Sequence, residues 1–332
     1  DNIGKDFTRV VVPVQLAEPL SLVQKPLEVL ENIALLKRAA TTDDPHLRML
    51  LAFTASFLVL SNAILRLKKP FNSLLGETYE YIGEGVRAVA EQVSHHPPVL
   101  AYHVEGEDFE MSGSLFVSVS ITLSKALLCA KGENVFHFKR YNERLHLIRP
   151  LASIRNIVFG KMFMWFVSEM SLTNQETGAR AFVDFLPKSA DEKCNYQVKG
   201  KLLDAEGNVQ YLLHGRWDCE LYASRPDASE PMLLGRAVPL SAESAQQFYF
   251  SDFVINLNNL TAAMAARLPR TDARFRPDLR AYEHGDDALA EAEKAKLENK
   301  QRLACKAPEG KVWQPQWFEY VQTGNSHTTR FE

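Results

Sequence analysis

The sequence predicts a single large α+β domain, residues 1–332, built on an antiparallel β-sheet that curls or closes. Between residues 77 and 255, short segments that alternate apolar and polar residues are separated by hairpin signals such as "GEG", "KGEN" and "DAEGN". No helix of crossover length lies between these segments, which favours antiparallel pairing. A run of so many strands curls or closes on itself. Helical patterns flank the strands on both sides, and no repeat or composition break divides the chain.

The composition is that of an ordinary globular protein. The 332 residues carry a net charge of −3, with 46% hydrophobic and 24% charged residues. This excludes a disordered or collagen-like chain, and it gives no bulk attraction for nucleic acid. We therefore expect no nucleic-acid partner, and any site for an anion must be a local cluster of cations.

The cysteines and the first residues bear on the cellular compartment. Cys129, Cys194, Cys219 and Cys305 are far apart and form no CxxC pair, which disfavours a zinc site or a disulfide-rich secreted scaffold. A reducing, cytoplasmic location is the simplest expectation. The start "DNIGKDF" has neither a methionine nor a signal-peptide pattern, so we expect a piece cut from a longer protein.

Residues 1–40 and 41–76 are expected to be mainly helical after a short strand, "RVVVPV". The first helix candidate is "PLEVLENIALLKRAA". The second begins at Pro45 with Asp44 as its N-cap. It contains seventeen uncharged residues between Arg48 and Arg66, fewer than the about 20 that a membrane span needs. We therefore predict a buried helix rather than a membrane-spanning one.

The clearest strand is "VSVSITLS", in which Val117, Val119, Ile121 and Leu123 share one face and hydroxyl side chains the other. This pattern predicts a sheet that is apolar on one side. Residues 256–332 are expected to be mainly helical, with a long helix from Asp286 in "DDALAEAEKAKLENKQRLACK". The following "APEGKVWQPQWFEY" is interpreted as a loop with an aromatic anchor.

Two adjacent histidines in "EQVSHHPP", Glu91–Pro98, end a strand-like run. Pro97 favours an extended conformation at His96, and the two prolines cannot donate to a strand ladder. A metal site is disfavoured, because the sequence around the histidines has no HExxH or HxH motif and no nearby cysteine. Ser94 is not in a GxSxG elbow, so a catalytic base is disfavoured. A structural histidine pair and an anion-binding pair remain open, because imidazoles donate hydrogen bonds and take up protons beside phosphate.

Four segments together resemble the oxysterol-binding protein-related family of lipid-transfer proteins. They are "EQVSHHPP", "GKDFTRVVVPVQLAEPLS" near the start, "LKKPFNSLLGETYE", and "TDARFRPDLRAYEHGD" followed by "AEKAKLENKQR". They occur in the order and approximate spacing of that family. The sequence departs from the pattern at Ser73, where a proline often stands, and at Pro26, which should kink or shorten the helix of the lid.

The resemblance implies an incomplete antiparallel β-barrel around an apolar lipid tunnel, with an N-terminal lid in residues 1–40 and flanking helices. It also implies a phosphatidylinositol 4-phosphate head group at the tunnel mouth. Matched residue by residue, that site comprises Lys69, Asn72, His95, His96, Lys294, Glu298 and Arg302. No metal, cofactor or catalytic residue is expected.

The spacing of the last three residues is consistent with that role, since i, i+4 and i+8 lie along one helix face. Lysine and arginine supply phosphate donors. Taken alone, the same pattern also describes an exposed ladder of ion pairs.

The resemblance further implies a non-enzymatic cytoplasmic protein that works peripherally at membranes or membrane contact sites. It would exchange phosphatidylinositol 4-phosphate for a second lipid, with sterol expected first and phosphatidylserine as the alternative. A phosphoinositide-binding scaffold without a second cargo, and an enzyme using His95 or His96 as a base, are the rival hypotheses. A lipid with about 30 methylenes costs on the order of 25 kcal/mol to expose to water, so transfer needs an enclosed apolar interior.

Overall fold

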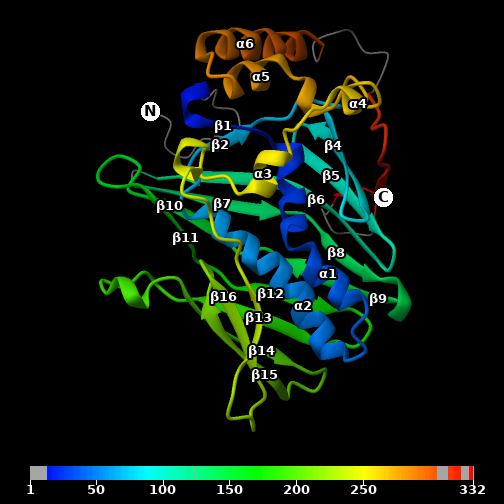
Figure 1. Ribbon diagram of the computed structural model, residues 1–332, viewed down its shortest axis with the longest axis vertical. Helices are drawn as coiled ribbons and strands as arrows, with labels where there is room; N and C mark the ends of the chain where they lie inside the picture. Colours follow the sequence, from blue (N-terminus) through cyan, green and yellow to red (C-terminus); the bar gives the residue numbers. More distant parts are fainter. Residues whose placement is uncertain (1–12, 123, 305–312, 323–328, 332) are drawn as a thin grey trace.

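The computed structural model describes residues 13–122, 124–304, 313–322 and 329–331, and its main feature is one open sheet of 15 strands (Figure 1). Every pairing between strands of this sheet is antiparallel, as the hairpin signals predicted. The strands are β3 Thr78–Gly83, β4 Val86–His95, β5 Pro98–Gly106, β6 Phe109–Ile121, β7 Lys125–Lys131, β8 Asn134–Phe138, β9 Glu143–Ile148, β10 Ala152–Arg155, β11 Phe163–Phe166, β12 Met170–Asn174, β13 Arg180–Phe185, β14 Gln197–Leu203, β15 Val209–Arg216, β16 Glu220–Ser224 and β17 Met232–Arg236.

Helices flank the sheet, and two small sheets complete the fold. The α-helices are α1 Ile33–Ala40, α2 Pro45–Leu58, α3 Asp252–Asn256, α4 Ala262–Ala265, α5 Pro277–Glu283 and α6 Asp287–Ala304. The 3-10 helices are η2 Val14–Leu16, η3 Leu22–Asn32, η4 Val59–Ala63, η5 Lys139–Tyr141, η6 Glu192–Cys194, η7 Ser244–Gln246 and η8 Ala273–Phe275. β1 Ala17–Ser21 pairs in parallel with β2 Lys69–Phe71, and β18 Tyr320–Gln322 pairs with β19 Thr329–Phe331.

The sheet divides along β6. The first half of this strand pairs with β8 and the second half with β7, while β5 lies on its other side. Gly113 stands at the change of partner, where an added Cβ would lie 2.2 Å from the carbonyl oxygen of Glu133. A side chain does not fit there, so glycine lets three strands meet closely enough for the sheet to curl.

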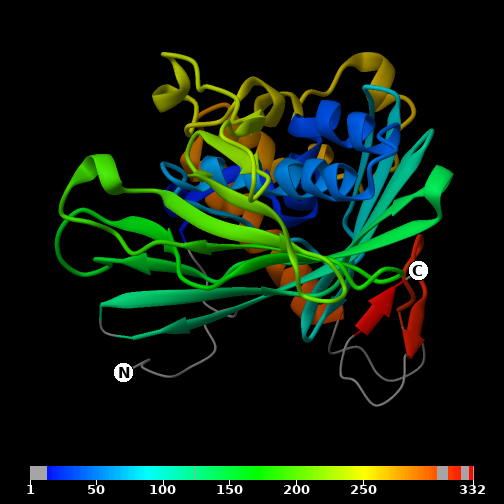
Figure 2. The ribbon, with the colours of Figure 1, turned by 90° about the horizontal axis from the view of Figure 1, so that it is seen from below.

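Helix α2 occupies the concave side of the sheet and is part of the main core (Figure 2). The Asp44 side chain accepts hydrogen bonds from the amides of His46 and Leu47, as expected of an N-cap. Pro45–Ala63 is the one helix in the described residues that is long and apolar enough to cross a membrane, and 61% of its most apolar window is buried inside the fold. The prediction of a buried core helix is confirmed.

The interior face of the sheet is apolar where the strand "VSVSITLS" runs. Across four strands, one row contains Val119, Leu128, Ala152 and Phe166, and Ala152 and Phe166 belong to the main core. The next row contains Ile121, Ala126, Ile154 and Met164. The predicted apolar face is therefore confirmed for the described residues, while Leu123 lies outside them.

Several expected boundaries were wrong in detail. Residues 22–32 form the 3-10 helix η3 around Pro26, so the first α-helix starts only at Ile33. Proline cannot donate the hydrogen bond of a regular α-helix, which agrees with the expected shortening. In the 41–76 region the helices end at Ala63, and Lys69–Phe71 is a strand that pairs with β1.

The strand region and the C-terminal region also differ from expectation. The last strand of the large sheet, β17, ends at Arg236 rather than near residue 255. The C-terminal region contains the antiparallel pair β18–β19 besides its helices. The backbone amides of Gln316 and Trp317 donate to the Glu91 carboxylate, and Phe318 packs on Val93, Val99 and Ala101, so the expected aromatic anchor is confirmed. Residues 1–12 of the expected lid and Cys305 lie outside the described residues.

Candidate functional site

The segment from Lys69 to Glu77 is held by a buried polar network. The Glu77 carboxylate accepts from the amide of Leu74 at 2.8 Å and from Arg276 at 2.7 Å, and it also bonds the Ser21 hydroxyl. The hydroxyl of Ser73, a position at which the sequence departs from the motif pattern, accepts from the Val23 amide at 3.1 Å. Because these partners come from distant parts of the chain, they fix the loop that follows β2, the strand in which Lys69 lies.

Lys69 is a cation in an unfavourable place. Its amine donates to the side-chain oxygen of Asn72 at 2.5 Å. Burial and then repulsion from Lys294, partly offset by attraction to Glu298, together lower the pKa of Lys69 to about 8. A phosphate placed here would restore the charge balance that the fold leaves incomplete.

Helix α6 carries the three predicted residues along one side, at the end of the molecule where α5 also lies (Figure 1). The Lys294 amine lies 3.6 Å from Glu291, and an Arg302 guanidinium nitrogen lies 3.9 Å from Glu298. Glu291 also accepts from the amide of Val14 at 2.9 Å, which ties α6 to the start of the described chain. Of the expected ladder, the structure shows the Glu298–Arg302 pair, while Lys294 pairs with Glu291. Lys294 and Glu298 also act electrostatically on Lys69.

The two histidines lie at the β4–β5 turn, where the chain reverses between His95 and Pro98. The His96–Pro97 peptide bond is cis, and the imidazole centroids are 4.7 Å apart. Burial lowers the pKa of His95, and the neighbouring His96 lowers it further. The turn therefore brings two adjacent side chains to one place, which an extended chain would not allow.

Gln301 joins the histidines to the Lys69 segment, and sequence reasoning missed it. Its side-chain oxygen accepts from the backbone amide of Leu75 at 2.8 Å. That bond fixes the orientation of the amide group, so its nitrogen donates to Nε2 of His95 at 2.8 Å. The same amide nitrogen lies 3.3 Å from Nδ1, so Gln301 faces both ring nitrogens of His95. The available signal was the position of Gln301 seven residues after Lys294, on the same helix face.

The structure thus arranges the seven predicted residues as two connected groups at one end of the sheet. Lys69, Asn72, Lys294, Glu298 and Arg302 form one group. The histidine pair forms the other, and Gln301 links it to α6 and to the loop after β2. We call these seven residues with Gln301 the head-group cluster.

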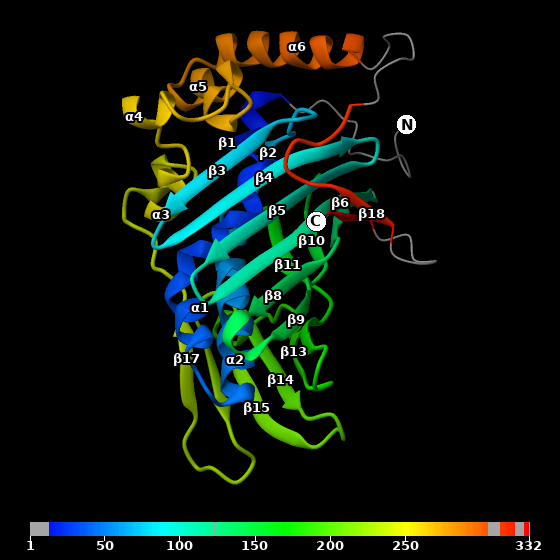
Figure 3. The ribbon, with the colours of Figure 1, turned by 90° about the vertical axis from the view of Figure 1, so that its right-hand side faces the viewer.

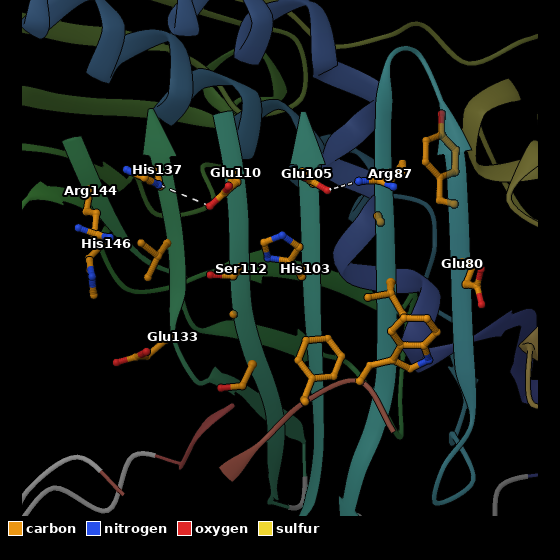
Figure 4. A pocket seen from close by; sticks show the side chains of 18 of the residues that line it. Glu80, Arg87, His103, Glu105, Glu110, Ser112, Glu133, His137, Arg144 and His146 are labelled. Carbon is orange, nitrogen blue, oxygen red and sulfur yellow. Dashed lines mark hydrogen bonds and ion pairs between the residues drawn. The ribbon is translucent and has the colours of Figure 1, made fainter. Parts of the chain in front are cut away.

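A separate groove of about 1200 Å³ lies on the outer face of β3 to β6, β8 and β9 and contains none of the predicted residues (Figure 4). Figure 3 shows these strands from that side. Arg87 pairs with Glu105 at 2.6 Å, and His137 lies 3.5 Å from Glu110. In the part of the chain that the structure describes, no group of three or more His, Cys, Asp or Glu side chains could hold a metal ion. The residues that line the groove and are labelled in Figure 4 are Glu80, Arg87, His103, Glu105, Glu110, Ser112, Glu133, His137, Arg144 and His146.

Comparison with known proteins decides the family. The model of the oxysterol-binding protein family matches residues 1–332. The chain belongs to the oxysterol-binding protein family. It is 31% identical to mouse oxysterol-binding protein-related protein 1, over 95% of this chain and 38% of that protein. It is 32% identical to oxysterol-binding protein-related protein 3B of Arabidopsis thaliana, over 96% of this chain and 71% of that protein.

Solved structures of family members share the fold. A crystal structure of the Osh1 ORD domain in complex with cholesterol has a TM-score of 0.89 and 28% identity, over 99% of this chain and 84% of that one. The Osh3 ORD in complex with PI(4)P from Saccharomyces cerevisiae has a TM-score of 0.86 and 30% identity, over 97% of this chain and 86% of that one. The predicted fold class, an α+β incomplete antiparallel barrel with flanking helices, is confirmed. The chain spans only 38% of the length of the mouse relative.

Proposed function

We propose that this domain binds phosphatidylinositol 4-phosphate, with the phosphorylated head group at the head-group cluster and the acyl chains inside the sheet. The observation that carries the proposal is the meeting of Lys69, the histidine pair and α6 at one place, although Lys294 and Gln301 of α6 lie more than 200 residues after Lys69 and His95. The structural similarity to a family member solved with PI(4)P supports the choice of ligand.

The cluster has suitable chemistry for a phosphate. Lys69, Lys294 and Arg302 offer ammonium and guanidinium donors, and charge-assisted hydrogen bonds to phosphate are the strong ones. Glu298 can accept from an inositol hydroxyl, and the imidazoles of His95 and His96 can donate. None of these roles requires covalent chemistry, so we propose a carrier rather than an enzyme.

We further propose that the domain exchanges this lipid for a second one at membranes. The apolar rows across β6, β7, β10 and β11 offer an interior wall for a hydrocarbon body. Sterol is the favoured second lipid, because the similar Osh1 domain was solved with cholesterol and with ergosterol. Phosphatidylserine is the alternative second lipid.

The test compares two single variants, Lys69→Ala and Arg302→Ala, with Lys296→Ala as the control. Lys296 lies on the same helix as Arg302 but is paired with Glu293. Each lost phosphate bond is worth about 1.5–3 kcal/mol, so uptake of phosphatidylinositol 4-phosphate should weaken roughly tenfold to hundredfold in the two test variants. Sterol uptake should change little, since its apolar body would lie elsewhere.

The outcomes separate the hypotheses. Parental phosphoinositide uptake by a folded Arg302→Ala protein would place the site elsewhere and leave α6 with an ion-pair ladder only. A loss of both lipids with a lowered melting temperature would mean a structural role. The absence of any co-purifying or loaded lipid by mass spectrometry, with head-group binding retained, would instead indicate a scaffold.

A further inference from the structure

The loop between β10 and β11 presents apolar side chains to solvent. Residues 155–162 are all exposed, and Phe159 and Val158 have 86% and 56% of their surface accessible. Ile157 and Met162 are the other large exposed apolar residues of this loop. Four apolar side chains exposed together on one turn are unusual on a monomeric surface and mark an interaction site.

The loop is shaped to present these residues. Asn156 has a φ of 60° and donates through its side-chain amide to the carbonyl of Lys161 at 3.2 Å. Gly160, at the tip, has a φ of 88°. The hydrogen bond closes the turn at its base, so Val158 and Phe159 project from a defined loop.

Cations surround the apolar tip. Arg155 stands directly opposite Lys125 across the β7–β10 ladder, and like charges in that position are unfavourable without a counter-anion. Lys161 lies within the loop, and Lys188 lies 5.5 Å from the ring of Phe163. Segment 155–163 contains no carboxylate. Within the described residues, none of these four cations forms an ion pair with an acidic side chain.

The loop lies at the same end of the sheet as the histidine turn. Strands β4, β5, β6, β7, β10 and β11 are successive neighbours, and each runs antiparallel to the next. Because neighbours alternate in direction, β6 and β10 run in the same direction as β4. The last residues of β6 and β10 therefore lie at the end of the sheet where β4 ends at His95. The loop after Arg155 therefore projects from the end of the sheet that carries the head-group cluster.

We propose that the β10–β11 loop inserts Val158 and Phe159 into the surface of an anionic bilayer, with its four surrounding cations over the lipid phosphates. This inference rests on the proposed lipid-carrier function and names the surface that meets the donor or acceptor membrane. An apolar tip ringed by cations matches a membrane interface, which offers hydrocarbon below a layer of negative charge. A membrane contact here also places the head-group cluster on the membrane-facing end of the domain.

The experiment measures flotation with phosphatidylcholine vesicles that contain or lack phosphatidylglycerol, an anionic lipid that is not a proposed cargo. The apolar variant is Val158→Ser with Phe159→Ser, and the charge variant is Lys161→Gln with Lys188→Gln. The control is Ile82→Ser, because Ile82 is 81% exposed on β3 at the opposite end of the sheet. All the changed side chains are exposed, so the variants should fold.

We expect the apolar variant to bind anionic vesicles roughly tenfold or more weakly, as follows from losing a buried aromatic side chain. The charge variant should lose the preference for phosphatidylglycerol and its sensitivity to salt. The control should bind like the parent. Any of three results would overturn the proposal. The apolar variant could bind as well as the parent, the parent could fail to bind anionic vesicles, or the only effect of the apolar variant could be a loss of self-association.

A second readout separates this inference from the proposed function. Loading of a fluorescent sterol from a cyclodextrin carrier needs no membrane, so the apolar variant should load as much sterol as the parent. Failure of the parent to load any lipid would count against the carrier function, while the flotation result would still decide the role of the loop.

Discussion

Lys69 shows how packing changes the chemistry of one side chain. The residue is an ordinary lysine in sequence, but burial and Lys294 lower its pKa to about 8 in the folded domain. A lysine with that pKa is mostly charged at neutral pH and loses its proton as the pH rises through about 8. Binding of a phosphate would stabilise the charged form and therefore raise the pKa.

This shift predicts that affinity for a soluble inositol phosphate falls as the pH rises from about 7 to about 9. Above the pKa of about 8, free Lys69 is neutral, so binding must take up a proton, which lowers affinity by up to about tenfold per pH unit. Titration calorimetry in two buffers of different ionisation enthalpy measures both the affinity and the proton uptake.

Lys69→Arg is the matched control, because an arginine stays charged throughout this range. The variant should bind with little dependence on pH. An equal loss of affinity in the parent and in Lys69→Arg would assign the effect to another group.

At the scale of the element, a buried ion cluster holds β1, η3 and the segment between η4 and β2 together. Arg66 donates to Glu18 at 2.8 Å and to Glu28 at 2.9 Å. Lys25 also reaches Glu28, at 2.7 Å. Burial alone would raise the pKa of Glu28, but attraction to Arg66 and then Lys25 outweighs it and lowers the pKa to about 2. Of these elements, β1 and η3 belong to residues 1–40, the region expected to contain the lid.

Arg66→Ala should therefore destabilise the domain by about 3–5 kcal/mol, because it leaves two buried carboxylates without their main partner. Arg87→Ala is the control. It removes the arginine of the Arg87–Glu105 ion pair. The Arg87 side chain is 72% exposed, whereas the Arg66 side chain is 2% exposed. An exposed pair should contribute only about 0–1 kcal/mol. Urea unfolding compares the two, and similar losses of stability would contradict the assignment.

At the scale of the whole molecule, the curled sheet has an apolar inner face, and the head-group cluster lies at one end of this sheet. The apolar rows of β6, β7, β10 and β11 and the core around α2 face the same side of the sheet. If both proposed lipids use this interior, they exclude each other, and exchange between membranes follows from competition alone.

We predict that phosphatidylinositol 4-phosphate displaces a bound fluorescent sterol with a final stoichiometry of one lipid per chain. His95→Ala with His96→Ala should still load sterol but lose the displacement, since the head-group donors are gone. Native mass spectrometry of the loaded protein gives the stoichiometry directly. A species that carries one molecule of each lipid would disprove a shared interior, and a marked loss of stability in the double variant would assign the histidines a structural role.

Much of the fold could be predicted because its signals are local. The capped start at Asp44 and Pro45 and the alternation around Val117 depend on neighbouring residues, and both predictions were confirmed. The boundary errors have non-local causes. Lys69–Phe71 is a strand only because β1 lies beside it, and such pairing between distant segments leaves no periodicity in a three-residue stretch.

The amino-acid sequence by itself determined the family and the antiparallel α+β architecture, because these follow from motifs and short-range patterns. The family resemblance suggested the seven cluster residues, and their role in binding stays a prediction. Only the tertiary structure decided the partner change at Gly113, the bridging role of Gln301 and the lowered pKa of Lys69. The physical reason is that close packing, desolvation and Coulomb interactions depend on distances between side chains, and folding sets those distances between residues far apart in the chain.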